Sequence, residues 1–369
     1  MPAVATSKAL LVAARAALVL AVALCAAGPW IFDSNQLTLL TEFFTVLVLV
    51  LMWNLLAGFA DIVSVGQHGF VGVGAYAFYG LTALAGINAF AAIPLAMLVT
   101  LLLAIPCAAI VFRLRAAYLA VGTWVVAEVL MLTAGKLPGF GFGSGTSLPI
   151  PIVKEFGAGA GARLTHFYIM AFALAVIAFG ATWLLLRSRF GLGLIAMRDN
   201  EEAAGSAGVD LTFSRAACFL WTAPILGFVG VLVTLQKLRV APTASFSITD
   251  WTIYIIFIAV IGGVGSLEGP IVGTIVFFLL REYLANFGTW YLILLGALSI
   301  AIVLIMPQGL WGLWRKTFSV GLLPIGHIAV RADRARQLDL STDPGEHHDI
   351  RTDLAGRHAK QALGSTPEG

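Results

Sequence analysis

The residues between Arg15 and Arg113 contain no lysine and no arginine. A gap of 97 residues, from 16 to 112, fits only segments that are surrounded by lipid or by packed protein. The whole chain is 60% hydrophobic and only 11% charged, whereas soluble domains carry about a quarter charged residues. The gap therefore predicts membrane-spanning segments, and the composition excludes the soluble classes. The ionisable residues inside it are Asp33, Glu42, Asp61 and His68.

Apolar runs bounded by glycine, proline or charge give ten candidate spans. A helix needs roughly 20 apolar residues to cross a bilayer, so the run at 251–264 predicts a half-span or a broken helix. The fold class that follows is an all-α polytopic membrane bundle of about 8–10 transmembrane helices, with short broken helices. The candidates lie at about 9–27, 37–57, 69–84, 93–112, 116–134, 167–186, 216–235, 251–264, 270–287 and 289–306.

The placement of basic residues predicts the orientation, because positive loops stay on the cytoplasmic side of a membrane. With ten spans and a cytoplasmic N-terminus, 16 of the 22 Lys and Arg residues lie inside. Both termini are therefore expected in the cytoplasm. The first 30 residues are also compatible with a cleaved signal, since Lys8 and Arg15 precede an apolar stretch that contains Ala21, Val22 and Ala23. We favour a retained helix, because the next run begins within ten residues.

The composition divides the chain into three parts. Residues 1–36 form an N-terminal cytoplasmic start and first transmembrane helix, and residues 37–318 form a membrane core. Residues 319–369 form a polar tail, which we expect to be cytoplasmic and disordered because it is charged and has few large apolar residues.

An outside loop at 135–166 is rich in glycine and proline, so we expect no regular long helix there. Two interpretations stay open for this loop. It is either a plain flexible connector or a surface for docking or gating.

The cytoplasmic loop at 187–215 is the most charged stretch between spans, with four arginines and four acids. Asp199 or Asn200 can cap a short helix whose first turn carries Glu201 and Glu202. We expect that helix to end near Gly205 or Gly208. The loop is either an ordinary charged anchor of topology or a lever that another protein grips to move the adjoining spans.

Two glycine-rich segments interrupt apolar runs, one after Gly66 and one after Ile261. Glycine allows close helix packing, and it also allows breaks that line a cavity, so both interpretations remain. Glu128 is the one carboxylate deep in a predicted span, either as a structural hydrogen-bond partner or in a pathway. The possible translocation path comprises Gly66, Gln67, His68, Gly72, Gly74, Glu128, Gly262, Gly263, Gly265 and Glu268.

The sequence lacks a phosphate-binding G-x-x-x-x-G-K-[ST] loop, a metalloprotease motif and a serine nucleophile elbow. Its three cysteines have no paired spacing, so we expect no metal site. We therefore expect a transport chain that is not an enzyme and has no catalytic residues. Few intramembrane carboxylates argue against proton coupling, so uphill transport needs energy from a separate subunit.

Five stretches make the sequence similar to a known family. Residues 198–205 read RDNEEAAG, and residues 261–273 read IGGVGSLEGPIVG, in that order. The chain resembles the LivM-type permease subunit of bacterial branched-chain amino acid ABC importers, within the LivH/LivM permease family. The similar stretches are 53–78, 112–129, 188–210, 250–273 and 288–313.

The resemblance implies an importer in the bacterial inner membrane. Its partners would be a second, LivH-type permease, two ATP-binding subunits and a periplasmic substrate-binding protein. No cofactor is expected on this chain, because the partner subunits use the ATP. The cargo implied is leucine, isoleucine and valine. The ATPase-coupling loop implied is Arg198, Asp199, Asn200, Glu201, Glu202, Ala203, Ala204 and Gly205.

Three alternatives stay open at this point. The same machinery can import urea, short amides or other amino acids, since the binding protein selects the cargo. A secondary transporter would instead depend on an ion gradient, so its uptake would stop with an uncoupler and continue after ATP depletion. A membrane scaffold would have no central path.

Overall fold

The computed structural model describes most of the membrane part of the chain. The chain divides after Leu323 into two units, and all described residues belong to the first. The predicted tail lies outside the described residues, as do most of the span predicted at 289–306 and residues 1–15 of the predicted start. The structure describes residues 16–17, 19–114, 117–284, 293, 296–297, 300 and 309–318.

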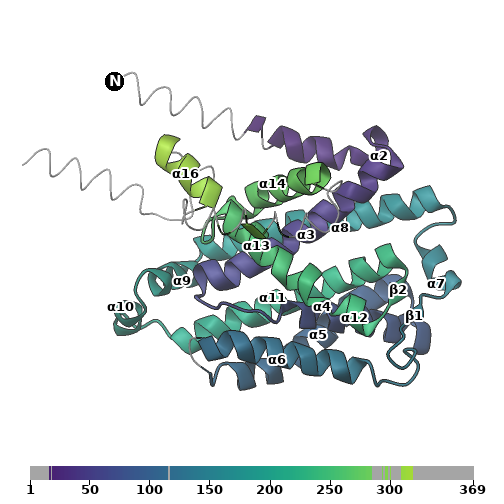
Figure 1. The fold of residues 1–369 in the computed structure, drawn as a ribbon, viewed down its shortest axis with the longest axis horizontal. Helices are drawn as coiled ribbons and strands as arrows, with labels where there is room; N and C mark the ends of the chain where they lie inside the picture. The colour runs from purple at the N-terminus through teal and green to yellow at the C-terminus, as the bar shows by residue number, and fades with distance from the viewer. Residues whose placement is uncertain are drawn as a thin grey trace, which may run out of the picture. The chain divides into compact units, whose positions relative to one another are not determined.

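The described residues form an almost wholly helical unit, which confirms the predicted all-α polytopic class, while the number of 8–10 spans and the position of the termini stay predictions (Figure 1). The helices are α2 (Gly28–Ile31), α3 (Ser34–Phe59), α4 (Gln67–Tyr79), α5 (Ala89–Val111), α6 (Ala117–Ala134), α7 (Ile150–Glu155), α8 (Ala160–Arg187), α9 (Arg189–Asp199), α10 (Glu201–Ser206), α11 (Leu211–Lys237), α12 (Pro242–Ser245), α13 (Tyr254–Gly262), α14 (Gly269–Leu284) and α16 (Gly309–Phe318), with π-helical turns η1 (Gly80–Leu84) and η2 (Thr249–Ile253) and strands β1 (Thr146–Ser147) and β2 (Arg239–Val240). Four of the described helices, α3, α5, α8 and α11, are long and apolar enough to cross a membrane, and the segment from Pro242 to Gly262 is a fifth candidate span.

Helix α3 lies at the centre of the core. Its start is fixed by a capping box, in which Asp33 accepts from the Gln36 backbone and the Gln36 side chain accepts from the Asp33 backbone. Beyond the first turns its side chains are buried on nearly every face, as expected of a helix that is apolar all round. It packs against α8, α11, α13 and α14.

Helix α4 is a second packing centre. It contacts α11, α5 and α6, and nearly all of its residues are buried. Helix α5, by contrast, buries only 28% of its most apolar window, so most of its surface is left for lipid or for another protein.

The span predicted at 251–264 is broken, as expected. The chain passes from α12 through the π-helical turn η2 into the nine-residue helix α13. Gly263 then ends α13 with φ of 114°, a backbone conformation that side-chain-bearing residues rarely adopt. From Pro242 to Gly262 the broken segment has 21 residues and is long enough to span.

The predicted irregular loop at 135–166 is only partly irregular. Gly139, Gly141, Gly143 and Gly145 all have positive φ, so this stretch turns tightly and forms no helix. Strand β1 then pairs antiparallel with β2, and α7 follows. The loop ends earlier than expected, because α8 begins at Ala160, where the apolar residues of that span start to pack. The two-stranded ribbon of β1 and β2 lies at the opposite end of the helices from α10 (Figure 1).

Candidate functional site

Helices α9 and α10 form a helical hairpin between α8 and α11, which we call the α9–α10 hairpin. Asn200 separates the two helices, with an extended backbone at φ −160° and ψ 108°. Its side-chain oxygen accepts from the backbone of Ala203 at 2.9 Å, which satisfies a free N–H of the first turn. Glu201 and Glu202 occupy that turn. The predicted short helix is confirmed, with Asn200 rather than Asp199 as its cap.

Arg198 attaches the hairpin to the end of α3 and to the loop after α13. Its guanidinium donates to the carbonyl oxygen of Gly265 at 3.2 Å and lies 5.7 Å from the ring centroid of Phe59. It also pairs with Asp199 at 3.0 Å. This arginine therefore joins three segments that are distant in sequence.

The loop that receives Arg198 is itself fixed by a buried amide. Asn54 of α3 is 1% exposed, and its side-chain oxygen accepts from the backbone of Gly265 at 2.8 Å. Its side-chain nitrogen donates to the carbonyl oxygen of Ser266 at 2.8 Å. Because both ends of the amide are bonded, the loop is held rigidly against α3.

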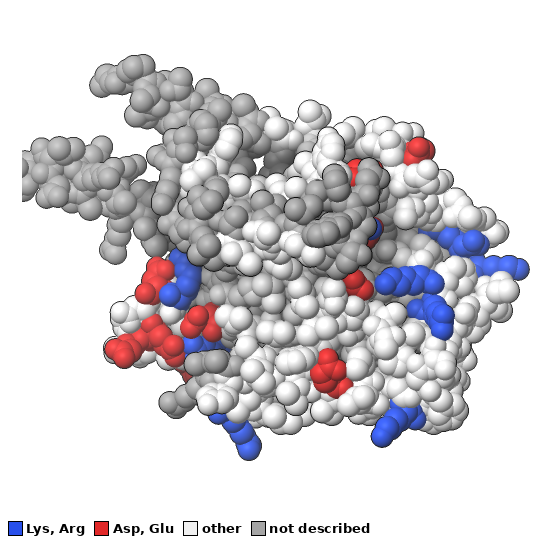
Figure 2. All heavy atoms as spheres, in the orientation of Figure 1, with Lys and Arg blue, Asp and Glu red and all other residues white. Residues whose placement is uncertain are grey.

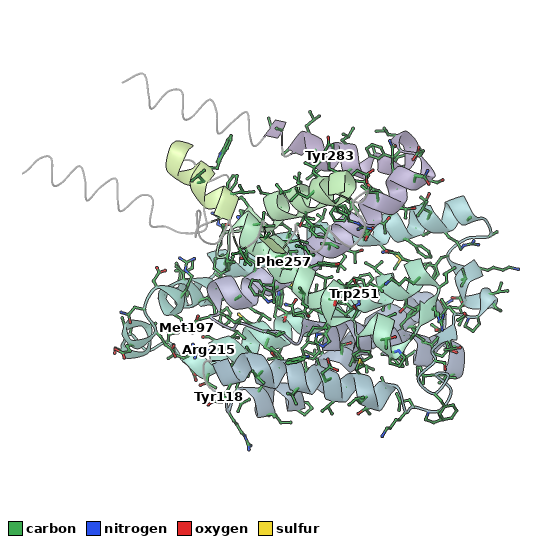
Figure 3. The ribbon with its side chains drawn as sticks, viewed as in Figure 1. Tyr118, Met197, Arg215, Trp251, Phe257 and Tyr283 are labelled. Carbon is green, nitrogen blue, oxygen red and sulfur yellow. The ribbon has the colours of Figure 1, made fainter. Side chains whose placement is uncertain are left out.

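Arg215 of α11 makes the second attachment of the hairpin. Its two terminal nitrogens donate to the two carboxylate oxygens of Glu201 at 3.0 Å each, a bidentate geometry with strong directionality. One of them also lies 3.4 Å from the carboxylate of Asp61, in the turn after α3. Figure 3 shows Arg215 at the same end of the helices as Met197 and Tyr118.

The surroundings of Asp61 in the structure differ from those that the sequence predicts. The sequence places it in apolar surroundings, but its side chain is 60% exposed at the end of α3. Its φ of 53° lies in the left-handed region, where a non-glycine residue is uncommon. That turn brings its carboxylate to Arg215.

The outer side of α10 is open. Glu202, Ala203 and Gly205 are exposed, while Ala204 is buried. The Glu202 side chain makes no hydrogen bond or ion pair with the described residues, and a hollow of about 730 Å³ is lined by residues of α10 and by Leu211. Figure 2 shows acidic and basic groups gathered over this end of the molecule. The surface is therefore suited to contact a protein.

A buried polar cluster lies where α4 begins. His68 is fully buried, and its Nδ1 lies 3.0 Å from the hydroxyl of Thr252 in η2. Its Nε2 lies 4.0 Å from a carboxylate oxygen of Glu128 on α6. That same oxygen of Glu128 accepts from Trp124 at 3.0 Å. The Gln67 side-chain amide is buried and has no hydrogen-bond partner among the described residues.

The glycines of α4 serve close packing. A Cβ at Gly66 would collide with the carbonyl oxygen of Thr123, and one at Gly74 with that of Gly227. A Cβ at Gly72 would strike the Phe246 ring. Small residues thus let α4 approach α6 and α11 at backbone distance.

The second glycine-rich segment also packs closely. A Cβ at Gly262 would collide with the carbonyl oxygen of Gly269, so α13 and α14 cross at backbone contact. Gly263 and Gly265 have φ of 114° and 78°. Glu268 is 6% exposed in the same loop. Close packing accounts for these glycines, and their part in a translocation path stays a prediction.

A wide hollow of about 1120 Å³ opens beside the hairpin. Its walls combine the charged groups of Asp61, Glu201 and Arg215 with apolar side chains from the start of α6 and from α11. Within the described part of the chain there is no group of three or more His, Cys, Asp or Glu side chains that could hold a metal ion.

Sequence analysis did not single out Asn54, Arg215, Thr252 or Trp124 as site residues. The i, i+4 spacing of Trp124 and Glu128 was a local signal that such a pair could meet on a helix. Asn54 is the one amide in the apolar stretch 46–57, a second available signal. The bonds of Arg215 and Thr252 join distant segments, so no local pattern predicts them.

Comparison with known proteins decides the family. Residues 35–303 match the model of the family described as "Branched-chain amino acid transport system / permease component". The chain belongs to this family. It is therefore a permease and a multi-pass inner membrane protein, in agreement with its apolar helices.

Individual relatives cover most of the permease. It is 26% identical over 310 residues to the high-affinity branched-chain amino acid transport system permease protein LivM of Salmonella typhimurium, covering 77% of this chain and 72% of the relative. It is also 26% identical to LivM of Escherichia coli over 79% of this chain and 74% of the relative. A probable LivH of Methanocaldococcus jannaschii is 28% identical over 40% of this chain and 49% of the relative. No solved structure matches.

Proposed function

We propose that this permease is the membrane subunit of an ATP-driven importer of leucine, isoleucine and valine. Two of its relatives are named as high-affinity branched-chain amino acid transport permeases, which supports that cargo. The chain carries no nucleotide-binding loop of its own, so ATP would be hydrolysed by partner subunits. A LivH-type permease and a periplasmic binding protein would complete the importer.

The single observation that supports an imposed motion best is the α9–α10 hairpin with its two arginine attachments. An ATP-binding subunit that grips the open side of α10 would move Glu201 and Arg198 together. Arg215 would pass that displacement to α11 and to the Asp61 turn, and Arg198 would pass it to α3 and the Gly265 loop. The hairpin would then act on both packing centres of the core.

This proposal requires the hairpin end to face the cytoplasm. The positive-inside rule supports that orientation, because with ten predicted spans the basic residues of the α8–α9 junction and those that follow the span predicted at 289–306 are expected on one side. The ribbon of β1 and β2 would then face the periplasm and the binding protein.

The test is uptake by the complete importer in membrane vesicles. Labelled leucine should accumulate when ATP is present and continue when an uncoupler removes the ion gradient. ATP depletion should abolish it. Accumulation that follows the ion gradient and ignores ATP would favour the secondary transporter. Uptake of urea or a short amide in place of leucine would assign another cargo to the same machinery.

Two hairpin variants sharpen the test. Gly205 has open surroundings within this chain, since an added Cβ meets only Leu211 at 3.8 Å. Gly205→Leu and Glu202→Arg should therefore fold and insert normally, yet lose leucine uptake because they disturb a partner. The matched control is Gly159→Leu at the other end of the molecule, where a Cβ also meets nothing within 4 Å. Unchanged uptake in both hairpin variants would contradict the lever.

A further inference from the structure

Helix α6 presents a continuous exposed face. Its most exposed side chains lie at spacings of three and four residues, so they fall on one side of the helix. Among the described elements, α6 contacts chiefly α4, α5 and α12, and these contacts cover its opposite side. The exposed residues are Tyr118 (76%), Val121 (54%), Trp124 (44%), Val125 (52%), Val129 (54%) and Leu132 (61%).

Glu128 lies on that face of the helix, with Trp124 on one side of it and Val121 and Leu132 on the other. Its side chain is 34% exposed, and it is about 9 Å along the helix axis from the end at Ala134. A glutamate side chain is too short to bring its carboxylate to the membrane surface from that depth. Figure 2 shows a largely uncharged surface over α6.

The contacts of the Glu128 carboxylate use only part of its capacity to accept hydrogen bonds. One oxygen accepts from Trp124, and His68 stands 4.0 Å away without a hydrogen bond to it. With 34% of the side chain exposed, the carboxylate is not enclosed by this chain. A carboxylate facing lipid in this way is strongly disfavoured, and intramembrane carboxylates almost always face protein or water.

The exposed apolar faces of the outer helices provide a contrast. Leu102 on α5 is 56% exposed and Ile177 on α8 is 66% exposed. The neighbours of both residues along their helices are apolar, with no ionisable side chain within a turn. Such faces are suited to lipid, whereas the α6 face is not. Val121 additionally lines the wide hollow beside the hairpin, so the α6 face is continuous with an open space.

We infer that the face of α6 around Glu128 packs against the companion permease subunit, a different chain of the same family. The partner would present hydrogen-bond donors opposite Glu128, because the carboxylate still has acceptor capacity to satisfy. This inference rests on the proposed function, since only an importer with paired permeases supplies such a chain. It assigns the contact surface, which family membership alone does not.

The experiment places a photoreactive benzophenone amino acid at Val125 in the complete importer, in native membranes. Benzophenone reacts with C–H bonds of whatever lies nearest, whether lipid or protein. We expect at least a fivefold higher yield of adduct with the companion permease from Val125 than from Ile177 or Leu102. Val121 offers a second position on the same face if the Val125 variant inserts poorly.

Three results would overturn the inference. These are adducts with lipid alone, adducts within this chain, or adducts with a second copy of it, from both Val121 and Val125. Leucine uptake and co-purification of the companion permease are measured on the same membranes. If no companion permease co-purifies, the proposed function fails. If it co-purifies but α6 reacts only with lipid, the α6 surface fails and the proposed function stands.

Discussion

The α9–α10 hairpin and helix α4 are attached to the rest of the permease in opposite ways. The apolar side of α9 packs into the core, but the α10 end of the hairpin is held by the long charged side chains of Arg198 and Arg215, whose partners are partly exposed. Helix α4 is held by glycines that bring backbone against backbone, with no room for a methyl group. Hydrogen bonds between long side chains can lengthen or reorient as the side-chain torsions rotate, whereas close backbone contacts leave no such freedom. The hairpin is thus suited to move, and α4 is suited to remain fixed to α11.

The largest effect should come from adding one methyl group to α4. Gly74→Ala puts a Cβ onto the carbonyl oxygen of Gly227, so the two helices must separate. We expect a loss of about 3 kcal/mol, at the upper end of overpacking costs. The matched control is Gly180→Ala on α8, where nothing lies within 4 Å and stability should rise by about 0.5–1 kcal/mol. Thermal unfolding of the solubilised permease measures both, and equal shifts would contradict the rigid contact.

The next effect should come from the rigid support of the Gly265 loop. Asn54→Ala removes the acceptor of the Gly265 N–H and the donor to Ser266, and leaves both backbone groups unpaired. We expect a loss of about 2 kcal/mol in stability. Asn35→Ala, on the exposed first turn of α3, should change it by less than about 0.5 kcal/mol. A harmless Asn54→Ala would show that the loop does not depend on α3.

A smaller effect, on coupling rather than folding, should follow from Arg215→Ala. The bond to Glu201 and the contact with Asp61 are lost, but these groups are partly exposed, so stability should hardly change. Leucine uptake should fall by about tenfold, while ATP hydrolysis by the importer continues.

Arg113→Ala is the control for the loss of one charge, since the Arg113 side chain is exposed and makes no hydrogen bond or ion pair with the described residues. Arg215→Lys should be intermediate, because lysine cannot donate in a bidentate fork. If Arg113→Ala and Arg215→Ala lower uptake equally, net charge rather than attachment explains the effect.

The smallest effect should come from Arg198→Lys. The charge near Asp199 stays, but the reach to the Gly265 carbonyl is lost. We expect a decrease of about two- to threefold in leucine taken up per ATP hydrolysed, as for a weak exposed contact. Arg113→Lys should leave that ratio unchanged. An equal decrease of that ratio in the Arg198→Lys and Arg113→Lys variants would show that the bond from Arg198 to the Gly265 loop has no part in coupling.

Local features were predictable from sequence and long-range attachments were not. The cap at Asn200 and the break at Gly263 arise from the conformational preferences of one or two residues, so the local sequence predicts them. The bond between Arg215 and Asp61 joins residues 154 apart, and that between Asn54 and Gly265 joins residues 211 apart. Such pairs depend on how the helices pack, which hydrophobic runs alone do not specify. For the same reason the sequence did not show which backbones the glycines of α4 contact, and their part in a translocation path stays a prediction.

The central claim is that the open side of α10 is gripped by an ATP-binding subunit. The direct measurement is photo-cross-linking from Ala203, which is exposed on that side, in the complete importer with and without ATP. The account predicts an adduct with the ATP-binding subunit whose yield changes when ATP binds. An adduct with the periplasmic binding protein, or none with the ATP-binding subunit in importer that still takes up leucine, would contradict it.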